Sequence, residues 1–406
     1  MVELVSTPLF GFTVCLVIVA LADVLAVITN AKIPAIAGSI LIYTLLIQLG
    51  MPKIFPDVSQ MGLIGDLLFN LYIVSIFTNF LPKMVVTEWK NVFIGLGGVI
   101  CAYVLVLGIG CILFDPREVI ACSGIVSGGG FQSGMMGLLR LQELGYKDLV
   151  MVPLAIVAFQ DVIGPLIGAF PVTAYVKQLV KRDAYLTEPL LKNSDEGNTS
   201  AHELALNSAE NPSPFFKSWI PAKYQTEAIS LAQLAIVALL GTILAEFIPI
   251  PSVIITFALS ALMVLLGFFR LNMLSRTGSA GFVDVAVMIM AAALMNDFDM
   301  NTFLMKLVPV TVIIVLSMIG LMIGGAITAK LFKQDMLLGA SACVGMFYLF
   351  PSITLVMNNV LRSYARNDEE KAYLTARLSP SFLVIGSVSS KLSLVIASFL
   401  IPVFIK

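Results

Sequence analysis

The stretch 127–134 holds the residues best suited to bind a small ligand. Its three consecutive glycines let the backbone turn sharply and let a ligand approach closely. If a helix begins after them, its free N–H groups and positive dipole end attract an anion. The alternative is close helix packing through small residues. The predicted carboxylate ligands here are Ser127, Gly128, Gly129, Gly130, Gln132 and Ser133.

A second segment, 336–360, repeats part of this chemistry without the glycine cluster. Ala342-Cys343-Val344-Gly345 resembles Ala121-Cys122-Ser123-Gly124, which precedes the glycines of the first segment. We expect the second segment to supply aromatic walls and polar groups instead. Its predicted ligands are Tyr348 and Ser352 for the substrate and Asn358 for a cation.

Ionisable residues inside apolar segments are costly and usually face a bundle interior or a water-filled cavity. Asp161, Asp284 and Lys391 are the deepest of these, and we predict that the two aspartates, with the amides of Asn70 and Asn358, bind a cation. Lys391 is the predicted counter-ion of the substrate. Asp161 and Lys391 could instead form a structural ion pair, which lowers the cost of two buried charges.

The composition indicates which elements must position these residues. Hydrophobic residues make up 59% of the 406 positions and charged residues only 12%, against roughly 45–50% hydrophobic in soluble domains. The apolar blocks match a helix crossing about 30 Å of hydrocarbon. They predict an all-α polytopic membrane protein with spans near 8–29, 34–50, 61–81, 92–114, 149–176, 226–247, 251–270, 279–298, 307–330 and 379–405.

Two moderately apolar segments rich in small residues, 119–139 and 336–360, are predicted re-entrant hairpins. The polar stretch 183–224 is a predicted linker between two five-span halves, 1–182 and 225–406, because it is too polar to bury a core. With both termini outside and the linker cytoplasmic, most of the 24 lysines and arginines fall inside. This distribution favours a multi-pass protein of the cell inner (plasma) membrane.

Weak similarity between the halves indicates an inverted repeat. Ile33-Pro34 corresponds to Ile250-Pro251, and Asp66 and Asn79 have the same spacing as Asp284 and Asp297. An odd number of spans per half inverts the second copy, an architecture typical of secondary transporters. Chance similarity among apolar helices is the alternative.

The segment from Ser127-Gly128-Gly129-Gly130 through Gly164-Pro165-Leu166-Ile167-Gly168 resembles bacterial sodium/glutamate symporters and, more distantly, the 2-hydroxycarboxylate carriers. The resemblance implies two five-span repeats with oppositely oriented hairpins. It also implies sodium-coupled uptake of a small carboxylate such as glutamate, with sodium as coupling ion and no other cofactor. Those families show Gly-Gly-x-Gly in both hairpins, whereas here the second hairpin has no glycine pair, and Lys391 is a further departure.

Other function classes fit less well. No His-Glu-x-x-His motif occurs and the single histidine, His202, lies in the linker, so we expect no enzyme. A net charge of −1 gives no basic surface for nucleic acid. Glycine-rich hairpins also build channel filters, which leaves an ion channel as the alternative of another class. The expected partners are a small carboxylate, membrane lipid and a second copy in a homodimer.

Overall fold

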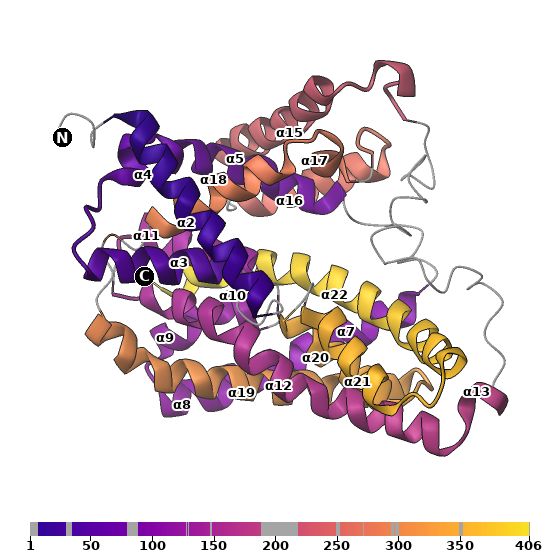
Figure 1. Ribbon diagram of the computed structural model, residues 1–406. Coiled ribbons are helices and arrows are strands. Elements are labelled where there is room, and N and C mark those ends of the chain that lie inside the picture. The colour runs from indigo at the N-terminus through magenta and orange to yellow at the C-terminus, as the bar shows by residue number, and fades with distance from the viewer. Residues whose placement is uncertain are drawn as a thin grey trace. The chain divides into compact units, whose positions relative to one another are not determined.

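The computed structural model describes residues 7–29, 35–78, 88–126, 128, 130–146, 148–187, 218–248, 252–270, 272–293, 296, 300–348 and 352–405. All regular elements in these ranges are helices, with no strand among them (Figure 1). Most of the predicted linker, residues 188–217, lies outside the described ranges.

Among the described residues, five helical stretches are long and apolar enough to cross a membrane: Pro8–Ile28, Trp89–Leu113, Ile163–Lys181, Glu227–Phe247 and Leu304–Leu331. Shorter apolar helices accompany them. Large apolar side chains such as Leu9, Val27 and Phe247 are at least three-quarters exposed, which suits a surface covered by lipid. The chain is therefore a helical membrane protein, as its composition predicts.

In the described residues each predicted span falls on a helix, and three helices extend at least five residues beyond their apolar blocks. The last predicted span, 379–405, lies in a helix that begins at Asp368. There the Asn367 side chain accepts a 2.7 Å hydrogen bond from the backbone N–H of Glu370 and caps the helix. A prediction of spans from apolar blocks misses polar first turns of this kind. The spans 307–330 and 149–176 are likewise extended, to Met300–Leu331 and Met151–Lys181.

The chain forms two compact units, and each draws on both halves of the sequence. Unit 1 comprises residues 1–82 and 208–301, and unit 2 comprises residues 83–207 and 302–406. The compact units thus differ from the predicted repeats 1–182 and 225–406, since each takes about half of either repeat.

Unit 1 contains eight described α-helices, four from each half of the chain, and one short 3-10 helix (Ala222–Tyr224). The α-helices are α2 (Pro8–Ile28), α3 (Ala35–Gln48), α4 (Phe55–Val58), α5 (Met61–Thr78), α15 (Glu227–Phe247), α16 (Ser252–Leu265), α17 (Met273–Arg276) and α18 (Ala280–Ala293). Helix α5 packs against α15, α16 and α18, so helices of the two halves interleave.

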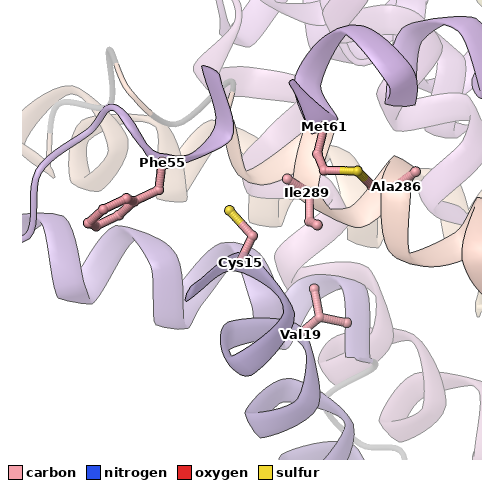
Figure 2. Packing of buried hydrophobic residues seen from close by; sticks show 6 residues of the cluster. All are labelled: Cys15, Val19, Phe55, Met61, Ala286 and Ile289. Carbon is pink, nitrogen blue, oxygen red and sulfur yellow. The ribbon is translucent and has the colours of Figure 1, made fainter. Parts of the chain in front are cut away.

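A buried apolar cluster joins the two halves within unit 1 (Figure 2). Cys15 and Val19 of α2, Phe55 of α4 and Met61 of α5 pack with two residues of α18. Those two residues are Ala286 and Ile289. At Gly65 of α5, an added Cβ would stand 2.6 Å from the carbonyl oxygen of Ala286, so glycine lets α5 and α18 approach closely.

Unit 2 contains the remaining helices and both predicted hairpins. They are α7 (Trp89–Leu105), continued by a short π-helical segment (Val106–Gly110) and α8 (Cys111–Leu113), then α9 (Pro116–Ala121), α10 (Ser123–Val126), α11 (Gly130–Glu143), α12 (Met151–Lys181), α13 (Ala184–Thr187), α19 (Met300–Leu331), α20 (Met336–Tyr348), α21 (Ser352–Tyr364) and α22 (Asp368–Phe404). Helix α12 packs against both α20 and α21 (Figure 1).

Small residues bring α7 and α19 into close contact in unit 2. An added Cβ at Gly320 would stand 2.9 Å from the backbone nitrogen of Ala102, and one at Gly324 would stand 2.8 Å from the Cα of Gly98. Later positions on α19 contact earlier positions on α7, so the two helices run antiparallel where they cross. Close backbone approach through glycine and alanine is typical of helix pairs in membranes.

A network of ion pairs links the end of α12 to the start of α22. The Arg366 guanidinium lies 2.6 Å from the Asp183 carboxylate and 2.7 Å from the Glu370 carboxylate. The backbone N–H of Arg366 also donates to Glu370 at 2.7 Å. These bonds to the guanidinium and the backbone hold the pKa of the Glu370 carboxyl below its usual range.

Candidate functional site

Each predicted hairpin contains a pair of helices joined by a short segment. We call this segment the break between the two helices. Helices α10 and α11 contact each other on either side of residues 127–129, and α20 and α21 contact each other on either side of residues 349–351. Gly128 has a φ of +92°, a conformation that L side chains rarely adopt. The glycine cluster therefore ends one helix and allows another to begin, as the sequence predicts.

The first break lies against the last turn of α20 inside unit 2. An added Cβ at Gly128 would overlap the carbonyl oxygen of Met346 and stand 2.7 Å from its carbonyl carbon. Gly128 belongs to the first break, and Met346 lies in the last turn of α20, just before the second. We call this meeting point the hairpin junction.

Helix α12 supports the hairpin junction through two glycines. An added Cβ at Gly164 would stand 3.0 Å from the Cβ of Tyr348, and one at Gly168 would overlap the Tyr348 ring. Tyr348 is only 2% exposed. Gly164 and Gly168 lie one turn apart on α12, so they form a flat face on which the aromatic ring rests.

Four buried side chains near the hairpin junction carry polar atoms with no hydrogen-bond partner among the described residues. They are Ser123, Ser133, Gln160 and Tyr348. Leaving such a group unpaired costs about 1–3 kcal/mol, so a buried unpaired group calls for a water, ion or ligand. Both the oxygen and the nitrogen of the Gln160 carboxamide belong to this set.

The placement of Gln160 and Ser133 relates them to the hairpin junction. Gln160 lies one helical turn before Gly164, on the face of α12 that meets Phe347 and Tyr348. Ser133 lies in the first turn of α11, where free N–H groups accumulate. An added Cβ at Gly124 of α10 would stand 2.9 Å from the Ser133 carbonyl oxygen, so α10 lies directly against this turn.

Pro165 adds a backbone group to the same turn of α12. Proline has no N–H, so inside a helix it leaves the carbonyl oxygen four residues earlier without its usual donor. That oxygen belongs to residue 161, directly after Gln160. A backbone carbonyl and a carboxamide oxygen are both ligands that a hard cation accepts.

Several predicted ligands lie at or near the hairpin junction. Gly128, Ser133 and Tyr348 do so in the described structure, and Gly130 begins α11. Ser127 and Gly129 lie outside the described residues. The side chains of Gln132, Asp161, Ser352 and Lys391 also lie outside them, so the predicted pairing of Asp161 with Lys391 stays a prediction.

The other predicted cation ligands are spread over both units. Asn70 on α5 and Asp284 on α18 are exposed in unit 1, whereas Asn358 on α21 is exposed in unit 2. The Asn70 amide donates to the Asp66 carbonyl at 3.1 Å within its own helix. Within the described part of the chain, no group of three His, Cys, Asp or Glu residues could hold a metal ion.

Sequence reasoning did not single out Gln160 or Ser123. A signal existed for Gln160, because it is an amide in an apolar span, one turn before a glycine and adjacent to Asp161. Ser123 carries no such signal, since serine bonds easily to its own helix backbone in apolar helices.

No model of a known protein family matches this chain, and no curated protein matches it either. Its function is therefore inferred from its own residues and their arrangement.

Proposed function

We propose that this chain is a secondary active transporter that couples sodium entry to the uptake of a small carboxylate, such as glutamate, across the cell inner membrane. The observation that carries the proposal is the hairpin junction. There, two broken helix pairs, one from each half of the chain, meet beside buried polar atoms that have no partner among the described residues. Irregular backbone inside a membrane is tolerated only against protein or water, and transporters use it to bind their substrates.

The order of helices supports a duplicated, inverted architecture. In the first half, α2, α3, short α4 and α5 precede α7, the broken pair and α12. In the second half, α15, α16, short α17 and α18 precede α19, the other broken pair and α22. Five spans per half would invert the second copy, and the antiparallel crossing of α7 and α19 is the geometry that two inverted equivalents adopt about a pseudo-two-fold axis.

The first turn of α11 is the proposed binding site of the substrate carboxylate. Its N–H groups and dipole favour an anion, and the unpaired Ser133 hydroxyl is buried in the same turn. Gln132 adds a second hydrogen bond, and Lys391 of α22 provides a counter-charge. Tyr348 closes the site from the other broken pair.

The proposed coupling cation binds on α12. The carbonyl oxygen that Pro165 leaves free at residue 161, the Gln160 carboxamide and the Asp161 carboxylate supply oxygen ligands for sodium. Because the anion and the cation would bind on neighbouring helices, each stabilises the other. This attraction gives coupling a physical basis.

The division into units offers a way to alternate access. Unit 2 holds both broken pairs together with α7, α12, α19 and α22, and unit 1 holds the other apolar helices of both halves. In the proposed cycle, unit 2 moves as one body and exposes the hairpin junction to one side of the membrane at a time.

The test is uptake of labelled glutamate into proteoliposomes under an inward sodium gradient, with aspartate, malate and citrate as competitors. Replacing sodium by choline should abolish uptake. Gln160→Ala, Ser133→Ala, Gln132→Ala and Asp161→Ala should each reduce it by at least about tenfold, as expected when a bound ion or polar group loses its partner. Gln142→Ala, at an exposed position of α11, is the matched control and should behave like the unchanged protein.

The competitors separate the alternatives. Displacement by malate or citrate without glutamate uptake would make the chain a 2-hydroxycarboxylate or other organic-anion carrier. Unitary currents in planar bilayers, persisting without a gradient of substrate, would identify a channel and overturn the proposal.

A further inference from the structure

Helix α10 is a single turn, Ser123–Val126, that ends where the first break begins. The last four carbonyl groups of any helix have no N–H partner within it, so in so short a helix every carbonyl belongs to this set. An isolated turn also has little stability of its own. Other elements must therefore satisfy these carbonyl groups and hold the turn in place.

Two hydroxyl groups from other helices donate hydrogen bonds to α10. The Tyr103 hydroxyl of α7 donates to the Ser123 carbonyl oxygen at the start of the turn. The Ser317 hydroxyl of α19 donates to the Val126 carbonyl oxygen at the end of the turn. Ser317, Ser123 and Val126 are all buried, so the two bonds are shielded from bulk water. The turn is thus held at both ends.

The crossing of α7 and α19 brings these two hydroxyl groups to the same turn. An added Cβ at Gly320 of α19 would stand 2.9 Å from the backbone nitrogen of Ala102 of α7. Ser317 lies about one helical turn before Gly320, and Tyr103 follows Ala102 directly. Both donors therefore come from the point where the two helices pack most closely.

The bond that Ser317 makes is not the usual one for a serine in an apolar helix. Such a hydroxyl commonly donates to a carbonyl oxygen of its own helix, one turn earlier. Thr328, farther along α19, makes that bond, because its hydroxyl donates to the Gly324 carbonyl oxygen. A hydroxyl has only one proton to donate. The bond from Ser317 to Val126 therefore takes the place of a bond within α19.

The Val126 carbonyl oxygen is important for the start of α11. In an uninterrupted helix, the N–H of residue 130 would donate to the carbonyl oxygen of residue 126. The first break separates these two groups, and α11 begins at Gly130. Ser317 supplies the donor that the Val126 carbonyl oxygen loses at the break. The N–H groups in the first turn of α11 remain for another acceptor.

We propose that Ser317 and Tyr103 are positioning residues, which fix α10 and the first break and so keep the first turn of α11 available to a carboxylate. The inference rests on the proposed function, because it explains how the proposed carboxylate site keeps its shape. Neither hydroxyl contacts the substrate in this proposal, since each acts through the backbone of α10. Packing holds another side of the turn: an added Cβ at Gly124 would stand 2.9 Å from the Ser133 carbonyl oxygen.

Hydrogen–deuterium exchange of the reconstituted protein tests the positioning role without any substrate. Ser317→Ala and Tyr103→Phe each remove one donor, and Ser317→Thr keeps a hydroxyl at the same position. Thr328→Val is the matched control. It removes an α19 hydroxyl that donates to the Ile94 carbonyl oxygen of α7 at 3.3 Å. Thr328 lies about 16 Å from Ser317 along the helix axis.

Amides of α10 and α11 should exchange at least about fivefold faster in Ser317→Ala and Tyr103→Phe, because local opening is easier once a buried carbonyl group has lost its donor. Ser317→Thr and Thr328→Val should exchange like the unchanged protein in these two helices. Unchanged exchange of α10 and α11 in both Ser317→Ala and Tyr103→Phe would overturn the positioning role.

Uptake kinetics distinguish positioning from a purely structural role. In proteoliposomes, Ser317→Ala and Tyr103→Phe should raise the substrate concentration for half-maximal uptake by about five- to tenfold, the equivalent of one hydrogen bond. Ser317→Thr should restore the original concentration, and Thr328→Val should not change it. A loss of thermal stability with an unchanged half-maximal concentration would make the two hydroxyl groups structural and contradict the proposal.

The two measurements also separate this inference from the proposed function. If the unchanged protein took up no carboxylate, the proposed function would be wrong, yet faster exchange in Ser317→Ala would still support the contribution of Ser317 to α10. If sodium-coupled uptake occurred while Ser317→Ala and Tyr103→Phe altered neither exchange nor uptake, the positioning role alone would be wrong.

Discussion

Gly128 stands so close to Met346 that no Cβ fits between the Gly128 backbone and the Met346 carbonyl oxygen. The two residues belong to different halves of the chain. Their contact places the break after α10 against the last turn of α20 and defines the hairpin junction on which the proposed function depends.

Gly128→Ala should impair the protein for two separate reasons. Its φ of +92° costs about 1–2 kcal/mol for a residue with a Cβ, and the methyl group also meets the Met346 carbonyl. We expect lower thermal stability and loss of substrate uptake. Thermal unfolding in detergent and uptake in proteoliposomes measure the two effects.

Gly145→Ala is the control for Gly128→Ala. Gly145 also has a positive φ, +81°, but an added Cβ would meet nothing within 4 Å. It should therefore show the backbone cost alone and retain uptake. If both variants lost the same stability and kept the same uptake, the close contact between Gly128 and Met346 would not be needed for transport.

Tyr348→Phe should separate stability from substrate binding. The Tyr348 hydroxyl is buried without a hydrogen-bond partner among the described residues, so its removal should leave stability equal or slightly higher. If the hydroxyl binds substrate, the concentration for half-maximal uptake should rise by about three- to tenfold, the equivalent of one hydrogen bond. A marked loss of stability with unchanged uptake kinetics would assign the hydroxyl a structural role instead.

Gly324→Ala should loosen the crossing of α7 and α19. The added methyl would overlap the Gly97 carbonyl oxygen and stand 2.6 Å from the Cβ of Cys101. Overpacking of this kind typically costs about 1–3 kcal/mol. Thermal unfolding should show the loss, whereas Gly108→Ala, which has open space around it, should not.

The Glu370 carboxyl should make unit 2 sensitive to acid. Its folded-state pKa lies below the ordinary value of 4.5 because of Arg366. The stabilisation is therefore fully present above pH 4.5 and is lost as pH falls through the lowered pKa. Arg366 keeps its charge throughout this range.

Glu370→Gln removes the titrating group and tests this assignment. The variant should be less stable than the unchanged protein at pH 7, and the difference should shrink as pH falls below 4.5. Thermal unfolding across pH 3.5–7 measures both trends. A difference that stays constant over this range would show that Glu370 acts through packing or neutral hydrogen bonds.

The helical elements were predictable from the sequence, because blocks of about 20 apolar residues have few folded solutions in a membrane. The spans 8–29 and 226–247 coincide with α2 and α15 to within one residue. The glycines at 128–130 predicted the break between α10 and α11, since only glycine tolerates the φ found at Gly128. Helix ends were less predictable, because the polar first turns of α19 and α22 carry no hydropathy signal.

Which segments contact one another could not be predicted from the sequence and is known from the folded structure. Gly128 contacts Met346, and Gly164 and Gly168 contact Tyr348, although these positions lie far apart in the sequence. The burial of Gln160, with no partner among the described residues, depends on the same packing. The hydrophobic periodicity of a segment predicts which face of the helix is buried. It does not predict which other helix packs against that face. The compact units each combine both halves for the same physical reason: membrane helices associate through matching small-residue surfaces, whatever their order along the chain.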